Sequence, residues 1–295
     1  MRLALGGVQF GTNYGVSNRH GQPSQRKVAE ILTLAQDSNI EVIDTAIAYG
    51  NSEQVLGELV DITKKFEIIT KLPPLKKKKF SPADCAYYSE LLDLSYQKLQ
   101  TKKLSGLLFH SADDILKEGN EELLQKIHNL KKTKRLVKSG VSLYSQGSYS
   151  KLLNNPLVEL VQIPYNCFDT FFSSSGYLQK FKERNIEVHA RSSFLQGLLL
   201  MDLQDIPKYF LPWLDKLALF SQVASELSLS NLELALSYVV KEPNIDKLVI
   251  GVNDVKELEQ VTQAYNKALD VEHNRLPNLS SLDPKLINPA HWQLD

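Results

Sequence analysis

Residues 40–72, IEVIDTAIAYGNSEQVLGELVDITKKFEIITKL, contain two short apolar runs whose ends carry polar side chains. Asp44 lies near the end of the first run, and Tyr49 follows it in the next loop. Lys71 lies near the end of the second run. Apolar runs of this length, bounded by polar and turn-forming residues, are typical of buried β-strands. The stretch therefore predicts two strands that place chemically active side chains at their carboxyl ends.

The same alternation of short apolar runs and helical patterns continues along the whole chain. The eight expected strands are Leu3–Phe10, Ile40–Ala46, Phe66–Leu72, Ser105–His110, Val137–Leu143, Val158–Tyr165, Ile186–Phe194 and Asp246–Val252. Helical stripes are formed by Val28, Ile31, Leu32 and Ala35 behind Pro23 and Ser24, by Leu123, Ile127 and Leu130, and by Leu258, Val261, Tyr265 and Leu269; two more helices are expected at Trp213–Leu227 and Asn231–Lys241. Eight strand–helix units in a chain of 295 residues favour a closed (β/α)₈ TIM barrel, an α/β fold with a parallel sheet.

No linker rich in Pro, Ser or Gly divides the chain, so we expect a single domain. Residues 1–273 would form the barrel. Residues 274–295 lack a clear period, and we expect them to form an irregular tail that packs on the barrel.

Composition excludes several classes of protein. Lys and Arg total 34 and Asp and Glu total 34, so the formal net charge of zero gives no case for nucleic acid or an anionic membrane. No apolar stretch approaches the roughly 20 residues of a membrane span. Cys85 and Cys167 are the only cysteines, which fits a reducing compartment. We expect a cytoplasmic protein, with no signal peptide before LALGGVQF and with nothing in the fold that requires an oligomer.

Asp44, Tyr49, Lys71 and His110 form a set that could reduce a carbonyl group. Tyr49 could donate a proton, and an ammonium close to a phenol favours its ionised form. Asp44 would keep Lys71 charged and in place, and His110 would orient the carbonyl oxygen. Each residue alone could be a loop or surface residue, but carboxyl ends of barrel strands meet at one rim, where barrel active sites lie. The hydride would have to come from a nicotinamide cofactor.

These residues lie in motifs that resemble the aldo-keto reductase family. The segments are GGVQFGTNYG (6–15), VIDTAIAYGNSEQVLGELV (42–60), IITKLP (68–73), LLFHSADD (107–114), VQIPYN (161–166), RSSFLQGLLL (191–200) and VIGVNDVKELEQV (249–261). The pattern DTAxxYGxSExxLG is specific, and the resemblance covers almost the whole chain. It implies a (β/α)₈ barrel that binds NADPH, or NADH, across its rim, with Asp44, Tyr49, Lys71 and His110 as the catalytic residues.

The resemblance also implies a set of residues that bind the cofactor. These are Gly11, Thr12, Ser142, Gln162, Asn166, Arg191, Gly197, Leu198, Gly251, Asn253, Lys256 and Glu259. Four positions depart from the family pattern. Leu143 replaces an Asn after the fifth strand, and Arg191 replaces an aromatic residue that stacks on the nicotinamide. At the eighth strand, Asn253 and Glu259 replace the arginines that grip the 2′-phosphate of NADPH, which leaves NADH open.

Two further groups of residues have both a functional and a structural interpretation. Lys76–Lys79 could attract an anionic substrate or form a solvated loop. Tyr165, Phe168, Phe171 and Phe172 could wall a substrate pocket or pack helix on barrel. His20, His128, His189, His273 and His291 show no metal-ligand spacing, so we expect no metal.

The sequence therefore predicts an NAD(P)H-dependent oxidoreductase that reduces a small-molecule aldehyde or ketone. The segments QFGTNYG and FLQGLLL resemble those of bacterial family members associated with surface-sugar biosynthesis. This resemblance implies that the substrate is a sugar or sugar-nucleotide carbonyl compound. Two alternatives stand: a lyase or aldolase in which Lys71 forms a Schiff base, and a barrel that binds a dinucleotide without catalysis.

Overall fold

In the computed structural model, eight parallel strands form a closed barrel in which each strand pairs with the next along the chain. The model describes residues 1–144 and 149–294. The strands are β1 (Leu3–Gly6), β2 (Val42–Asp44), β3 (Glu67–Leu72), β4 (Leu104–Phe109), β5 (Leu136–Ser142), β6 (Leu160–Pro164), β7 (Glu187–Arg191) and β8 (Lys247–Ile250). Pairing of Leu3 with Leu248 and of Leu5 with Ile250 closes the ring. The expected single-domain (β/α)₈ barrel is confirmed.

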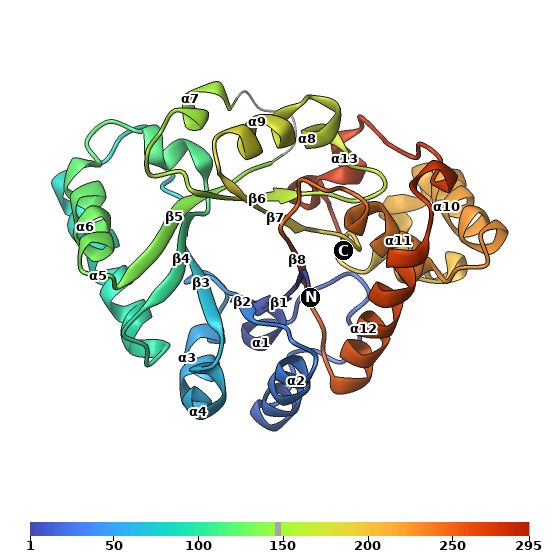
Figure 1. Cartoon of the computed structure of the whole chain (residues 1–295), viewed down its shortest axis with the longest axis horizontal. Coiled ribbons are helices and arrows are strands. Elements are labelled where there is room, and N and C mark those ends of the chain that lie inside the picture. Colours follow the sequence, from blue (N-terminus) through green and yellow to red (C-terminus); the bar gives the residue numbers. More distant parts are fainter. Residues whose placement is uncertain (145–148, 295) are drawn as a thin grey trace.

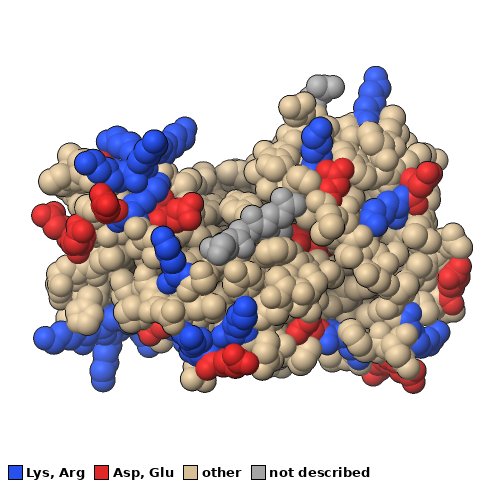
Figure 2. All heavy atoms as spheres, turned by 90° about the horizontal axis from the view of Figure 1, so that it is seen from above, with Lys and Arg blue, Asp and Glu red and all other residues tan. Residues whose placement is uncertain are grey.

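Helices surround the strands in chain order, which the colours of Figure 1 follow around the ring. The α-helices are α1 (Val8–Gly11), α2 (Gln25–Asp37), α3 (Ser52–Glu58), α4 (Val60–Thr63), α5 (Pro82–Lys98), α6 (Glu121–Lys132), α7 (Ser150–Leu153), α8 (Phe171–Ser174), α9 (Tyr177–Glu183), α10 (Leu214–Glu226), α11 (Asn231–Val240), α12 (Val255–Asp270) and α13 (Pro284–Ile287). The 3₁₀ turns are η1 (Ala112–Leu116), η2 (Leu198–Leu200), η3 (Leu203–Asp205), η4 (Lys208–Trp213), η5 (His273–Arg275) and η6 (Pro289–His291). Both signs of charge are spread over the face seen in Figure 2, with wide uncharged areas between them.

The helical stripes expected from the sequence face the barrel. All four apolar residues of the α2 stripe and all three of the α6 stripe are buried. Ser24 caps α2 by accepting a hydrogen bond from the backbone N–H of Lys27. The α12 stripe is buried except for Leu269, whose 44% exposure contradicts the expectation; Ala268 takes its place against the core.

The first strand is shorter than expected. It ends at Gly6, and residues 8–11 form α1 instead of continuing the strand to Phe10. The Gly7 N–H donates to the carbonyl of Asp44 at 2.7 Å, which turns the chain away from the sheet. A side chain on Gly7 would be crowded, since a Cβ there would lie 3.1 Å from Ser52 Oγ and 3.3 Å from the Asp44 carbonyl oxygen.

The C-terminal tail packs beside the barrel in a second apolar cluster. Leu279, Leu286 and Ile287 join Phe210 in this cluster, which also includes side chains of α10. Trp292 contacts Phe210 edge to face with ring centroids 4.8 Å apart. Where the sequence analysis expects irregular structure, the tail contains α13, η5 and η6.

Most aromatic residues after β6 belong to the packing layer. Phe168 and Phe172 are fully buried, and Tyr165 is nearly so. Phe172 packs against Tyr149 and Phe181, and Phe168 packs against Phe220 of α10. None of these rings lines the large cleft described below. The structure therefore favours helix-to-barrel packing over a substrate wall.

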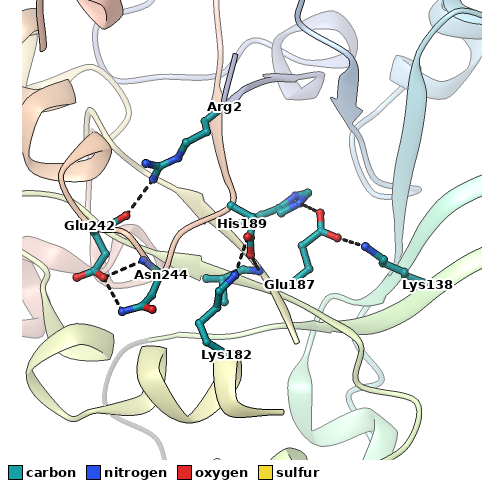
Figure 3. Close-up of polar contacts among 9 residues, drawn as sticks. Arg2, Lys138, Lys182, Glu187, His189, Glu242 and Asn244 are labelled. Carbon is teal, nitrogen blue, oxygen red and sulfur yellow. Dashed lines mark hydrogen bonds and ion pairs between the residues drawn. The ribbon is translucent and has the colours of Figure 1, made fainter. Parts of the chain in front are cut away.

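A polar network holds the amino-terminal end of the barrel together (Figure 3). Glu187 lies between two hydrogen-bond partners: it bonds His189 Nε2 at 2.7 Å and pairs with Lys138 of β5. Lys182 pairs with Asp246 at 2.7 Å, and Arg2 donates to the backbone carbonyl of Glu242 at 3.0 Å. Hydrogen bonds from His189 and Lys138 lower the pKa of Glu187 to about 2.

Replacing Glu187 with Gln should destabilise the protein in a pH-dependent way. The depressed pKa means that the ionised Glu187 contributes stability above the unfolded pKa of about 4.5, and that this contribution is lost as pH falls toward 2. We expect a loss of about 1–3 kcal/mol at pH 7, shrinking below pH 4.5. Urea unfolding at pH 7, 5 and 3.5 measures it. Glu159→Gln, at a more exposed carboxylate that pairs with Lys131, is the control. A Glu187→Gln effect that does not change with pH would contradict the assignment.

Candidate active site

An ion pair lies inside the carboxyl-terminal end of the barrel. Lys71 on β3 is fully buried, and its Nζ donates to Asp44 Oδ2 on β2 at 2.6 Å and to the Thr45 carbonyl at 2.9 Å. Gln162 on β6 donates to the other carboxylate oxygen of Asp44 at 2.8 Å. Burial by itself would lower the pKa of Lys71, but the Asp44 carboxylate and the Tyr49 hydroxyl outweigh burial and raise it. Lys71 is therefore a protonated ammonium group that these hydrogen bonds hold in position.

Tyr49 and His110 contact this ion pair from the rim. The Tyr49 hydroxyl lies 3.5 Å from Lys71 Nζ, and the ammonium is 5.0 Å from the centroid of the Tyr49 ring. The rings of Tyr49 and His110 meet edge to face at 5.9 Å. Asp44, Tyr49, Lys71 and His110 thus lie together, as the sequence analysis expects.

His110 is a neutral imidazole at neutral pH. Burial, followed by the positive charges of Lys71 and Arg191, lowers its pKa to about 4. Its Nδ1 is buried without a hydrogen-bond partner among the described residues. A neutral imidazole donates from one ring nitrogen and accepts at the other, so His110 can donate to an oxygen without carrying charge.

A cleft of about 650 Å³ opens beside these residues. Asp44, Tyr49 and His110 line one part of it. From there it extends past the ends of β7, β8 and β1 to the first turns of α12, and Pro289 and Ala290 of the tail border it. The volume is within the range of about 300–1,000 Å³ that is usual for small-molecule sites.

The expected cofactor residues fall into two groups. Those that line the cleft are Gln162, Arg191, Gly197, Gly251 and Asn253. Those that do not are Gly11, Thr12, Ser142, Asn166, Leu198, Lys256 and Glu259. Asn166 holds loops together: its Nδ2 donates to the Ser192 carbonyl at 3.1 Å, and its Oδ1 accepts from the N–H groups of Phe168 and Asp169.

Arg191 is fixed at the rim by two hydrogen bonds. It donates to the Leu143 carbonyl at 3.0 Å and to Ser192 Oγ at 3.2 Å. Its guanidinium lies 4.7 Å from the centroid of the Tyr144 ring, a cation–π contact. Among the described residues no carboxylate pairs with Arg191, so a rim salt bridge is not its role.

Several residues that hold Tyr49 in place were not singled out in the sequence. Ser52 Oγ donates to the Gly7 carbonyl at 2.7 Å and bonds Thr45 Oγ1 at 2.9 Å. Glu53 is buried and accepts from Thr70 at 2.6 Å and from Ser95 at 2.5 Å. Both belong to DTAxxYGxSExxLG, so the specificity of that motif was the signal for them.

Gly11 lets two loops pass each other at close range. A Cβ at this position would lie 1.8 Å from the Tyr49 carbonyl oxygen and 2.5 Å from the Ser52 nitrogen. Gly50, with φ of +55°, makes the reciprocal approach to the Gly11 carbonyl. The structure thus gives Gly11 a part in positioning Tyr49.

The fold and this geometry can be compared with known proteins. The model of the Aldo/keto reductase family matches residues 2–276. The chain belongs to the aldo/keto reductase family. Comparison with curated proteins gives no match.

Two solved structures of this family show the same fold. Aldo-keto reductase AKR11C1 from Bacillus halodurans, in its holo form, is 18% identical with a TM-score of 0.74, over 98% of this chain and 94% of that one. The putative aldo-keto reductase PA4992 from Pseudomonas aeruginosa is 22% identical with a TM-score of 0.66, over 91% of each chain. No helix in the described residues is long and apolar enough to span a membrane.

Replacing Gly11 with Ala should disturb the protein far more than a glycine replacement in open space. The new methyl group would meet backbone atoms of the Tyr49 loop, and overpacking of this kind costs about 3 kcal/mol. Gly21→Ala is the control, because Gly21 has nothing within 4 Å and a φ of +73°, so it should lose only about 1 kcal/mol. Denaturant unfolding compares the two, and equal losses would refute the close approach.

The His110 ring should titrate near pH 4. NMR of the ring protons, assigned with a His110→Asn variant, measures the midpoint. Because the folded pKa is below the unfolded value of 6.5, His110 should cost stability as pH falls from about 6.5 to 4, and none above 6.5. A midpoint near 6.5 would show that the ring is not held neutral by burial and by Lys71.

Proposed function

We propose that this protein reduces an aldehyde or ketone with NAD(P)H, with Tyr49 as the proton donor. The observation that carries the proposal is the Tyr49 hydroxyl 3.5 Å from a buried ammonium, at the wall of a cleft that admits a small molecule. Proton donation by a positioned side chain typically contributes about 10²–10⁴ in rate.

Each residue of the cluster has a distinct role in this proposal. Tyr49 donates its proton to the carbonyl oxygen, and the nearby Lys71 ammonium stabilises the negative charge left on the phenol oxygen. Asp44 holds Lys71 charged and in place, and Gln162 holds Asp44 through the other carboxylate oxygen. His110, neutral at the working pH, donates a hydrogen bond to the same substrate oxygen and fixes its position.

The residues present fit a nicotinamide dinucleotide, which supplies the hydride when bound. Gln9 and Ser193 line the cleft, and each has a buried side-chain oxygen without a partner among the described residues. Unpaired polar groups of this kind are costly in a folded protein, so a bound polar ligand explains them. We propose that Gln9 and Ser193 bind the cofactor together with Arg191 and Gly251. Ser142 Oγ is also buried and without a partner among the described residues, but it does not line the cleft.

The substrate end of the cleft is polar and aromatic. Tyr14, Tyr144, Arg191 and Gln196 line it beside Tyr49. Such a lining favours a polar carbonyl compound over a bulky apolar one, and a sugar carbonyl belongs to this class. Lys76–Lys79 do not line the cleft, so we do not assign them a substrate contact.

The geometry gives no support to a Schiff base on Lys71. Its side chain has no exposed surface and is ion-paired at 2.6 Å, and its raised pKa keeps it protonated. A Schiff-base lysine must be neutral and reachable. A barrel that only binds a dinucleotide would have no need for the Tyr49–Lys71–Asp44 arrangement.

Replacing Tyr49 with Phe tests the proton donor. We expect NAD(P)H-dependent reduction of a small aldehyde to fall at least about 100-fold, while cofactor affinity stays within about two-fold because the hydroxyl alone is lost. Steady-state kinetics and cofactor fluorescence measure the two quantities. Tyr87→Phe, at an exposed tyrosine of α5, should change neither. Full turnover by Tyr49→Phe would show that another group donates the proton.

A further inference from the structure

The direction of the cleft indicates where the distal part of a dinucleotide lies. This step rests on the proposed function. With the reacting ring beside Tyr49 and His110, an extended ligand follows the cleft past Gly251 toward the start of α12. The lining there includes Asn253, Glu257 and Gln260. The adenosine ribose of a bound dinucleotide would therefore lie among the side chains of this turn.

Glu257 is the charged group at this end of the cleft. Its Oε2 accepts from the backbone N–H of Asn253 at 2.7 Å and from Asn253 Nδ2 at 3.2 Å. Asn253 Oδ1 in turn accepts from Asn18 at 3.3 Å. The half-buried carboxylate is thus held in a fixed position. Both of its bonds to Asn253 end on Oε2, which leaves Oε1 to accept from a ligand.

The first turn of α12 offers a phosphate little attraction. The free N–H groups of a helix start commonly bind anions, but here Asp254 accepts from the Glu257 N–H at 2.9 Å and Glu257 takes the Asn253 N–H. The Asp254 and Glu257 carboxylates therefore already accept from two backbone N–H groups that could otherwise bind an anion. The exposed Lys256 does not line the cleft.

Among the described residues, no Lys or Arg lines the cleft beside Glu257. Arg191 is the one Lys or Arg that lines the cleft within the described chain, and it lies at the other end, against Tyr144. Lys27 and His20 border a separate depression of about 250 Å³ beyond Asn253 and Asp254. A 2′-phosphate dianion at this end would face a carboxylate whose partner is the neutral Asn253, whereas a hydroxyl could donate a hydrogen bond to it.

We propose that Glu257 makes this protein select NADH over NADPH, by accepting a hydrogen bond from the adenosine 2′-hydroxyl and repelling a 2′-phosphate. An acidic residue that binds this hydroxyl and an arginine that binds the phosphate are the two general solutions to the same choice. The preference is opposite to the one that the family resemblance implies.

Binding of the two cofactors to the purified protein tests the proposal. Titration with NADH and with NADPH, followed by the emission of the reduced nicotinamide, gives two dissociation constants. We expect NADH to bind at least about ten-fold more tightly, and the preference to widen at low salt, where charge repulsion is less screened. Glu257→Gln should reduce the preference several-fold, mainly by tightening NADPH.

Asp270→Asn is the matched control. Asp270 is an exposed carboxylate at the far end of the same helix that does not line the cleft, so its loss removes the same charge and should leave the ratio unchanged. If Glu257→Gln does not fold, Glu257→Met replaces it. Competition in the wild type between ADP-ribose and its 2′-phosphate measures the same site without the nicotinamide.

Each outcome decides between the two proposals. NADPH bound as tightly as NADH by the wild type, or an unchanged ratio in Glu257→Gln, overturns the role of Glu257 while leaving the reductase proposal in place. Binding of neither cofactor to a well-folded sample removes both proposals.

Discussion

The ion pair between Lys71 and Asp44 is the constraint around which the active end of the barrel is arranged. Both charged side chains are buried. Burying a charge away from water costs several kcal/mol unless hydrogen-bond or ionic partners replace the lost water. Further hydrogen bonds therefore replace the lost water: Lys71 also donates to the Thr45 carbonyl, and Asp44 also accepts from Gln162. These contacts come from β2, β3 and β6, so the pair depends on correct closure of the sheet. The buried Lys71 ammonium affects two neighbouring residues. It lies beside the Tyr49 hydroxyl, and its charge helps to keep His110 neutral.

The loop that carries Tyr49 is held by contacts that have no chemistry of their own. Ser52 connects it to the turn after β1, and Glu53 connects it to β3 and α5. Gly11 and Gly50 remove the side chains that would keep the two loops apart. A hydroxyl on a free loop would sample many positions, and reaction rates fall steeply when reacting groups are misplaced by about 1 Å. The polar network at the opposite end of the barrel, around Glu187 and Asp246, fastens the strands without facing the cleft.

The fold was predictable because its information is local and repeated. Each apolar run marks a strand, each 3.6-residue stripe marks a helix, and eight repeats leave few architectures open. The cluster of Asp44, Tyr49, Lys71 and His110 was predictable for the same reason, since parallel strands end at one rim. Strand ends were less certain: the Gly6–Gly7 turn depends on a bond to Asp44 that is distant in sequence. Other details depend on loop conformations, which the periodic pattern of apolar residues does not determine. Examples are the orientation of Asn166, the stacking of Arg191 on Tyr144 and the placement of Glu257 against Asn253.

The two sides of the cleft differ in how freely they can change. On one side, the loop that carries Tyr49 packs from behind against Gly11 so closely that there is no room for a new atom, and almost no substitution is tolerated at that glycine. On the other side, Pro289 and Ala290 come from a tail segment beyond residue 276, where the family match ends. Small side chains at that border can be enlarged without touching the ion pair. The wall that the tail contributes to the cleft can therefore vary independently of the contacts between Lys71, Asp44 and Gln162.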